Sequence, residues 1–323
     1  MSKILKPKSH QEWLELRTHG IGASEVGTIM GVNKYQTLYQ LWQSKKNAVI
    51  NEDDSNSALL WGHLLEPVVA ELYSLETGCK IVKSSSKEII YVAENKPYMR
   101  ISPDRLYYPK GVSAKASNLR LLECKTSLMP ISEDDVPKPY FCQVQYQMHV
   151  SGIHHCTLAW MNLSNRTFGY KDFEYDKQFC DYMESKVTEF WTHYIVGNEE
   201  PPVTSENDVK CKYPVAIQGS IVTADTDAID AVEHLKSLNN RKRELNAEIR
   251  TIEEQMSPYK IRVQSYMGDN ENLMVAGYDK PLITWKSKAE SEEFDTDKFA
   301  AENPSLYRKY LRRKAASRTF VIK

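Results

Sequence analysis

The stretch Leu119-Arg120-Leu121-Leu122-Glu123-Cys124-Lys125 sets a carboxylate and an ammonium within an otherwise apolar run. Its three leucines predict a buried strand. Side chains alternate between the two faces of a strand, so Glu123 and Lys125 share one face and Cys124 points to the other. A buried carboxylate and a buried ammonium cost free energy unless they are paired or bound to a metal. The stretch therefore predicts a strand that carries chemistry.

A second carboxylate, in Ser102-Pro103-Asp104, precedes this strand. Magnesium prefers oxygen ligands and retains several waters, which Asp104, Glu123 and the backbone carbonyl of Cys124 can provide. Phosphodiester hydrolysis uses such a centre, and an ammonium such as that of Lys125 can position the attacking water or stabilise the developing charge. The alternative is a Glu123–Lys125 ion pair on an exposed edge strand, with Asp104 in an ordinary turn.

Hydrophobic periodicity and turn residues predict the order of the elements. Helices are expected over residues 11–46, with a break at Gly20–Ser24 where Ser24 can cap the second piece, and over 59–77, 140–150 and 177–196. Strands are expected near residues 80–83, 88–93, 98–102, 119–125, 155–162 and 168–175. This order predicts an α/β or α+β domain over residues 1–200, with a central mixed β-sheet flanked by helices.

The rest of the chain is expected to be a connection over residues 201–226 and a mainly helical C-terminal extension over 227–323. A helix is expected over 228–256, then a strand over 281–286, a helix over 296–314 and an extended end over 319–322. The first of these helices carries an apolar seam of Leu238, Leu245, Ile249, Ile252 and Met256. So short a seam is expected to pack on its own chain, and the alternative is pairing with another chain.

Composition narrows the class of protein. The 323 residues are 41% hydrophobic and 26% charged, as in an average folded domain, and no apolar run approaches the roughly 18 residues of a membrane span. The N-terminal residues lack the apolar core of a secretory signal, so we expect a cytoplasmic protein. Six cysteines without a C-x-x-C pair do not indicate a zinc or iron–sulfur site. A net charge of −1 argues against a protein that coats nucleic acid, but it does not exclude a nuclease, whose metal-binding carboxylates would offset its basic residues.

Five separate segments resemble those of one family, the PD-(D/E)-x-K nucleases, and within it the YqaJ and lambda exonuclease group of phage recombination exonucleases. They are Arg17 with Gly22-Ala23-Ser24-Glu25-Val26, Trp61-Gly62-His63-Leu64-Leu65-Glu66, Met99-Arg100-Ile101-Ser102-Pro103-Asp104, Leu122-Glu123-Cys124-Lys125 and Gln143-Val144-Gln145-Tyr146. The match covers about residues 11–197 in the family's order. The segment after Ala228 resembles the C-terminal extension of YqaJ-type proteins.

The resemblance implies a role for each matched residue. Asp104, Glu123, the Cys124 carbonyl and Glu66 would bind Mg²⁺, for which Mn²⁺ can substitute. Lys125 would activate or position the attacking water, and Gln145 and Gln143 would hydrogen-bond that water or a phosphate. Arg17 and Ser24 would hold a 5′-terminal phosphate, because a guanidinium fork and the start of a helix suit a dianion. The family commonly has glycine where this chain has Arg105, so the turn after Asp104 must avoid a positive φ.

The implied activity is a double-strand DNA exonuclease that digests one strand from its 5′ end and leaves a 3′ single strand for phage-type recombination. Its expected partners are DNA ends and a single-strand annealing protein, in the cytoplasm of a bacterial host if the gene is phage-encoded, and a homo-oligomeric ring is possible in this group. The alternatives are an endonuclease or single-strand nuclease of the same fold in repair or defence, and a DNA-binding protein without turnover.

Overall fold

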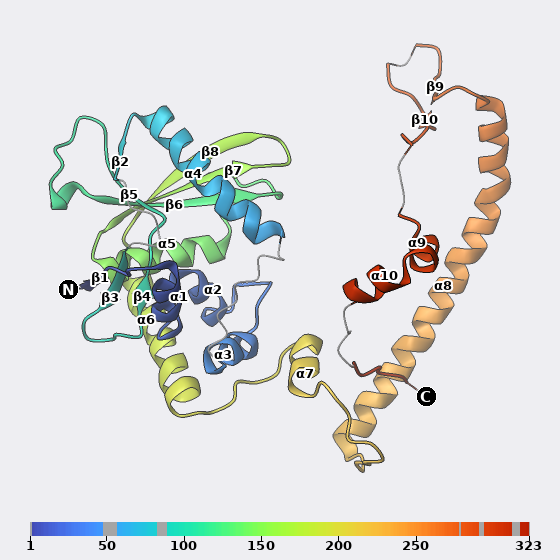
Figure 1. The fold of residues 1–323 in the computed structure, drawn as a ribbon. Helices are drawn as coiled ribbons and strands as arrows, with labels where there is room; N and C mark the ends of the chain where they lie inside the picture. The colour runs from blue at the N-terminus through green and yellow to red at the C-terminus, as the bar shows by residue number, and fades with distance from the viewer. Residues whose placement is uncertain are drawn as a thin grey trace. The chain divides into compact units, whose positions relative to one another are not determined.

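The strand that carries Glu123, β6 (Arg120–Ser127), lies at the centre of a five-stranded sheet in this computed structural model (Figure 1). The structure describes residues 2–47, 57–82, 89–277, 279–290, 294–311 and 317–322. The chain divides into two compact units, Met1–Lys212 and Tyr213–Lys323. The sheet belongs to the first unit, and the division falls inside the stretch where we expected a connection.

The central sheet is mixed, as predicted. Its strand order is β2-β5-β6-β7-β8, in which β6 and β7 are parallel and the other neighbours are antiparallel. The four strands besides β6 are β2 (Lys80–Val82), β5 (Arg105–Tyr108), β7 (His155–Asn162) and β8 (Thr167–Glu174). No strand was expected at β5, because four residues followed by Pro109 are too few to show a strand period.

Three further strands form a separate antiparallel sheet in the order β1-β3-β4. They are β1 (Ser2–Leu5), β3 (Ile90–Ala93) and β4 (Arg100–Ile101). The strands expected near residues 88–93 and 98–102 therefore exist, but they do not belong to the central sheet. They form a second sheet with an N-terminal strand that was not expected. Asp104 follows β4 and precedes β5, so it lies where the chain passes from one sheet to the other.

Two helices cover opposite faces of the central sheet (Figure 1). From α4 (Ser57–Thr77), Val69, Ala70 and Tyr73 pack with Leu122 and Cys124. The other face is covered by α5 (Lys138–Ser151), from which Val144 and Met148 pack with Leu121 and Leu158. Leu121 and Leu122 thus face opposite helices, as the strand period predicts, and Glu123 shares the α5 face with Leu121.

The N-terminal region forms three helices, not the two pieces expected: α1 (His10–Thr18), α2 (Ala23–Ile29) and α3 (Leu38–Lys46). The break that was predicted at Gly20–Ser24 is present, because the backbone there passes close to the backbone of Tyr98. Ile21 N–H donates to the carbonyl of Tyr98 at 2.7 Å, and a Cβ on Gly20 would lie 2.4 Å from the same oxygen. The N-cap of α2 is Gly22, so the prediction that Ser24 caps this helix is wrong, and Ser24 lies in its first turn.

The single helix expected over residues 177–196 consists of α6 (Lys177–Glu189) and a π-helical segment, Phe190–Val196. A 3-10 turn, Ala116–Asn118, precedes β6. The first unit ends with α7 (Glu206–Lys212), which is held by the buried Asp208. The carboxylate of Asp208 accepts hydrogen bonds from the Thr37 hydroxyl at 2.7 Å and from the Thr204 N–H at 3.0 Å. The expected connection therefore begins as ordered structure.

The second unit contains one long helix and several short elements. They are α8 (Thr226–Met267), β9 (Asn272–Leu273), β10 (Ile283–Thr284), α9 (Thr296–Glu302) and α10 (Pro304–Tyr310). β10 pairs with β9 and lies inside the strand expected over 281–286, and Pro304 separates α9 from α10. The extended end forms no strand in the part of the chain that is described. No described helix is both long and apolar enough to cross a membrane.

Candidate active site

Asp104 joins the loop after β4 to the central strand. Its Oδ2 accepts the backbone N–H of Cys124 at 2.9 Å. Burial raises the pKa of Asp104 well above its usual value, and the neighbouring carboxylates of Glu123 and Glu66 raise it further. The ionised form of Asp104 is therefore costly unless a cation stands beside it.

Glu123 is 1% exposed, and both of its carboxylate oxygens accept hydrogen bonds. Lys125 Nζ lies 2.5 Å from Oε1, to which Gln143 Nε2 also donates, and Gln147 Nε2 donates to Oε2 at 2.6 Å. Burial opposes the charged form of Lys125, but the carboxylates of Glu123 and Asp104 outweigh burial and raise its pKa. Lys125 therefore keeps its proton at neutral pH and acts as a hydrogen-bond donor.

Glu66 approaches the same region from α4 and is bound by the arginine that replaces the family's glycine. Arg105 Nη1 lies 2.6 Å from Glu66 Oε1 and 2.6 Å from the carbonyl oxygen of Asp104. Arg105 opens β5 and has no positive φ, since Arg166 and Asn198 are the non-glycine residues with positive φ among those described. The arginine is thus an internal partner of a predicted metal ligand, neither strained nor a simple surface residue.

The side chains described above, except that of Arg105, line one cavity of about 380 Å³. The members that were predicted as site residues are Arg17, Ser24, Glu66, Asp104, Glu123, Lys125 and Gln143. The guanidinium carbon of Arg17 lies 4.4 Å from the centre of the Trp13 ring, and burial by the surrounding protein lowers the pKa of Arg17. Ser24 is exposed at the start of α2. One wall therefore carries the carboxylates and lysine, and residues 13–24 contribute the arginine and the serine.

Gln145 does not lie at this cavity, which corrects its predicted place. Its Nε2 donates to the carbonyl of Glu174 at 2.9 Å, and its Oε1 accepts the N–H of Asp176 at 3.0 Å. Gln145 therefore joins α5 to the junction of β8 and α6. The sequence analysis missed Gln147, although it follows Gln143 by four residues, and a spacing of four places two side chains on the same helix face. Residues two apart, such as Gln143 and Gln145, do not share a face.

The residues of the cavity suit a divalent cation in their chemistry. Asp104 and Glu123 offer hard oxygen donors, and the raised pKa of Asp104 marks a place where positive charge is needed. Within the described part of the chain, no three acidic, histidine or cysteine side chains converge on one point. This agrees with Glu66 being turned toward Arg105. Asp104 and Glu123 therefore remain the predicted protein carboxylates of the site, with Glu66 adjacent to them.

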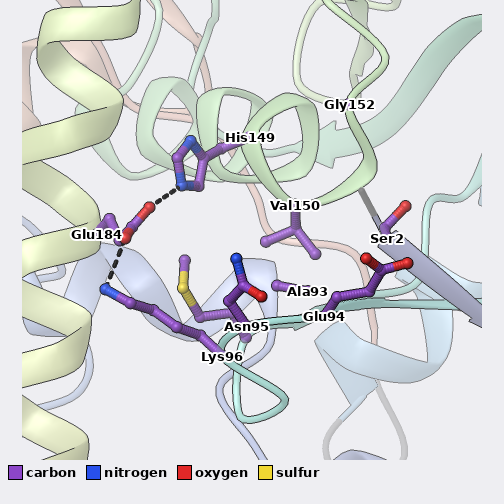
Figure 2. A pocket seen from close by; sticks show the side chains of 10 residues that line it. Ser2, Ala93, Glu94, Asn95, Lys96, His149, Val150, Gly152 and Glu184 are labelled. Atoms are coloured by element: carbon purple, nitrogen blue, oxygen red, sulfur yellow. Dashed lines mark hydrogen bonds and ion pairs between the residues drawn. The ribbon is translucent and has the colours of Figure 1, made fainter.

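A second cavity, of about 280 Å³, contains none of the predicted site residues (Figure 2). In it, Glu184 lies between His149 and Lys96 and contacts both, at 2.5 Å and 2.6 Å. Burial disfavours ionisation of Glu184, but the hydrogen bonds from Lys96 and His149 outweigh burial and lower its pKa. The cluster joins α6 to α5 and to the loop between β3 and β4, which is a structural role.

The central strand of the mixed sheet carries Glu123 and Lys125, and Asp104 is hydrogen-bonded to that strand, which is the arrangement that the sequence motifs predict. Residues 12–154 match the model of the YqaJ-like viral recombinase domain, and this range contains Asp104, Glu123 and Lys125. The resemblance is thus confirmed over residues 12–154, which are similar to the YqaJ-like viral recombinase domain. A curated relative, the uncharacterized protein YqaJ of Bacillus subtilis (strain 168), is 25% identical over 98% of this chain and 94% of its own length.

Solved structures are similar to part of the chain. An alkaline exonuclease, LHK-Exo, from Laribacter hongkongensis is 20% identical with a TM-score of 0.45, over 58% of this chain and 93% of that chain. A phage-related exonuclease from Haemophilus somnus 129PT is 12% identical with a TM-score of 0.40, over 56% of this chain and 96% of that chain.

Proposed function

We propose that this chain is a Mg²⁺-dependent DNA exonuclease that digests one strand of a duplex from its 5′ end and leaves a 3′ single strand. One observation carries the proposal: a single cavity is lined by Asp104, Glu123 and Lys125 and also by Arg17 and Ser24. The first three suit a scissile phosphate, and the last two suit a terminal phosphate. The recombinase domain over residues 12–154 supports a role in phage-type recombination.

Asp104, Glu123 and the backbone carbonyl of Cys124 would hold the magnesium ion, with Glu66 beside them. When bound, such an ion would polarise a phosphoryl oxygen and lower the pKa of a water molecule. Lys125 keeps its proton on Nζ, so it donates a hydrogen bond toward the charge that develops on the phosphate. Gln143 and Gln147 orient the Glu123 carboxylate by donating hydrogen bonds to Oε1 and Oε2, respectively.

Arg17 and Ser24 would bind the phosphate at the 5′ end. The Arg17 guanidinium makes a cation–π contact with Trp13, its central carbon 4.4 Å from the centre of the ring, and this contact holds the guanidinium at the cavity. A guanidinium binds two phosphate oxygens at once, and the exposed Ser24 hydroxyl offers a further donor. A phosphate bound at this wall would set the distance from the chain end to the carboxylates, which is how an end-directed nuclease differs from an endonuclease.

The product of this reaction is a duplex with a 3′ single-stranded overhang. Such an overhang is the substrate of a single-strand annealing protein, which we propose as the partner in the cytoplasm of a bacterial host. A homo-oligomeric ring around DNA remains compatible with the proposal.

The test is digestion of linear and closed-circular duplex DNA, each with Mg²⁺ or EDTA, with the linear duplex labelled at its 5′ or its 3′ ends. Magnesium-dependent release of 5′-labelled mononucleotides from linear DNA alone is the expected result. Nicking of circles would indicate an endonuclease, preference for single strands a single-strand nuclease, and binding without cleavage a DNA-binding protein.

Two variants connect this assay to the cavity. Lys125→Ala is expected to abolish cleavage and to leave duplex binding intact, whereas Lys115→Ala, which removes an exposed lysine outside the cavity, is expected to cleave normally. Arg17→Ala is expected to reduce the advantage of a 5′-phosphorylated end over a 5′-hydroxyl end. Full activity of Lys125→Ala, or an unchanged end preference of Arg17→Ala, would contradict the corresponding assignment.

A further inference from the structure

A stripe of apolar residues follows α8 over almost its whole length. Spacings of three and four alternate from Ala228 to Tyr266, which is the repeat of a coiled coil. The seam of the sequence analysis is the middle of this longer stripe. In order, the α8 stripe consists of Ala228, Ala231, Leu235, Leu238, Lys242, Leu245, Ile249, Ile252, Met256, Tyr259, Val263 and Tyr266. Lys242 is its single charged member, and Pro258, which interrupts the helix hydrogen bonding, lies outside it.

Most of the α8 stripe is exposed, contrary to the expectation that it packs on its own chain. At its C-terminal end, Met256, Tyr259 and Val263 line a cavity with Ile283 and Trp285 of the same chain. Leu235 is 39% exposed, Ile249 53% and Tyr266 81%, and the other large members of the stripe lie in this range except Val263. With 42 residues, α8 is about 63 Å long (Figure 1). The seven large apolar side chains of the stripe from Leu235 to Tyr259 would each bury on the order of 100 Å², or about 700 Å² per helix, which is close to the roughly 800 Å² per partner of a stable interface.

The charges that flank the stripe disfavour a parallel pair of two α8 helices. In the parallel register, Lys242 faces its own copy across the seam. Glu248 and Glu253 occupy the flanking positions that meet between parallel helices, so two carboxylates face one another on each side of the dimer. Like charges at such positions are destabilising.

An antiparallel pair in one register has complementary shape and charge. Its layers place small residues against large ones: Ala228 against Tyr259, Ala231 against Met256, Leu235 against Ile252, Leu238 against Ile249 and Lys242 against Leu245 of the second copy. The flanking pairs are then Asp225 with Lys260, Asp227 with Arg262 and Arg241 with Glu248, each formed twice by symmetry. No flanking position in this register brings like charges together.

Within one chain, the Arg241 guanidinium lies 3.1 Å from Glu244, and both side chains are about two-thirds exposed. An ion pair of this kind contributes little to stability, so exchanging it for Glu248 of a second copy costs little. We propose that α8 docks antiparallel against α8 of a second copy of this chain, centred between Lys242 and Leu245. The dimer joins two chains through their second units and is independent of the proposed nuclease chemistry.

The test is sedimentation of the full-length chain and of charge-reversed variants. Arg241→Glu and Glu248→Arg each turn two attractive pairs into repulsive ones, so each is expected to weaken dimerisation about tenfold or more. The double variant, R241E with E248R, restores opposite charges and is expected to recover the dimer. Matched controls are Arg243→Glu and Glu254→Arg, which make the same charge changes on the same helix away from the stripe and are expected to leave the dimer intact.

Circular dichroism of each variant checks that α8 remains helical. A full-length chain that stays monomeric up to about 100 µM would overturn the proposal, since interfaces of this area typically bind at micromolar or lower concentration. Glu248→Arg separates the two orientations, because it would strengthen a parallel dimer by removing the Glu248–Glu253 repulsion. A dimer or trimer that both single reversals leave unchanged would show that another surface mediates assembly and would also overturn the proposal.

Discussion

At the scale of single residues, the charges of the cavity are balanced by the chain itself. Lys125 contacts Glu123, Arg105 contacts Glu66, and Asp104 is left with a backbone N–H as its hydrogen-bond donor in the described residues. Asp104 is accordingly the carboxylate whose pKa is raised. A bound cation would therefore stabilise the ionised form of Asp104 more than it would stabilise the ionised forms of Glu66 or Glu123.

Asp104→Asn is expected to abolish cleavage and to stabilise the metal-free protein. Because the folded pKa lies above the usual 3.8, wild type loses stability as pH rises from that value through the folded pKa, and asparagine does not. At neutral pH we expect a melting temperature higher by about 2–4 °C in EDTA, with a smaller difference near pH 4. Mg²⁺ should raise the melting temperature of wild type alone. A variant less stable than wild type at every pH in EDTA would contradict the assignment.

Gln147 and Gln145 offer a matched pair of substitutions. Gln147→Ala removes a donor to Glu123 and is expected to lower kcat by about ten- to hundredfold, the usual effect of losing a hydrogen bond behind a functional carboxylate. Gln145→Ala removes the bonds to Glu174 and Asp176 and is expected to lower the melting temperature without a comparable loss of kcat. Equal losses of kcat in the two variants would refute this division of roles.

At the scale of elements, two connections matter. The loop between β4 and β5 positions Asp104 at the cavity, and the contact between α7 and α3 fixes the end of the first unit. The loop from β4 to β5 carries Asp104 from one sheet to the other, and the α5 face with Gln143 and Gln147 meets the face of β6 that bears Glu123. The short α7 is held against α3 by Asp208, whose carboxylate binds the Thr37 hydroxyl. This contact closes the first unit across 171 residues of sequence.

Asp208→Asn is expected to destabilise the first unit by about 1–3 kcal/mol near neutral pH, since it replaces a charged acceptor of several hydrogen bonds. Burial disfavours the ionised form, but the bonds from Thr37, Thr204 and Ser205 outweigh burial and lower the pKa. The contribution is therefore present above the usual 3.8 and lost as pH falls through the lowered pKa. Urea unfolding at two pH values measures it. Asp181→Asn, an exposed carboxylate on α6, is the control, and an equal effect of the two substitutions would contradict the prediction.

At the scale of the whole molecule, the division at Lys212 predicts where the chain can be cut. A chain of residues 1–212 is expected to fold, and to retain the nuclease activity proposed for the full chain, because all residues of the cavity and Asp208 are kept. A chain of residues 1–198 lacks Asp208 and is expected to melt at a lower temperature. Thermal unfolding and the digestion assay compare the two. A 1–212 chain that fails to fold would show that the second unit is needed for the stability of the first.

The sequence by itself determined the central elements of the fold and the core of the candidate site. Alternation along β6 places Glu123 and Lys125 on one face, and the bounds expected for β7 agree with the structure. These features depend on spacing within one element, where side-chain direction repeats every two residues in a strand and every 3.6 in a helix. The same rule could have identified Gln147, four residues after Gln143, in place of Gln145.

Only the tertiary structure decided which distant residues meet. The Arg105–Glu66 pair, the β1-β3-β4 sheet and the Thr37–Asp208 contact each join segments far apart in the sequence. No local period encodes such pairs, because they form when helices and strands pack and burial leaves each polar group to find a partner within reach. The strand pattern therefore predicts that Glu123 and Lys125 lie together, whereas packing determines that Arg105 neutralises Glu66 and that α7 completes the first unit.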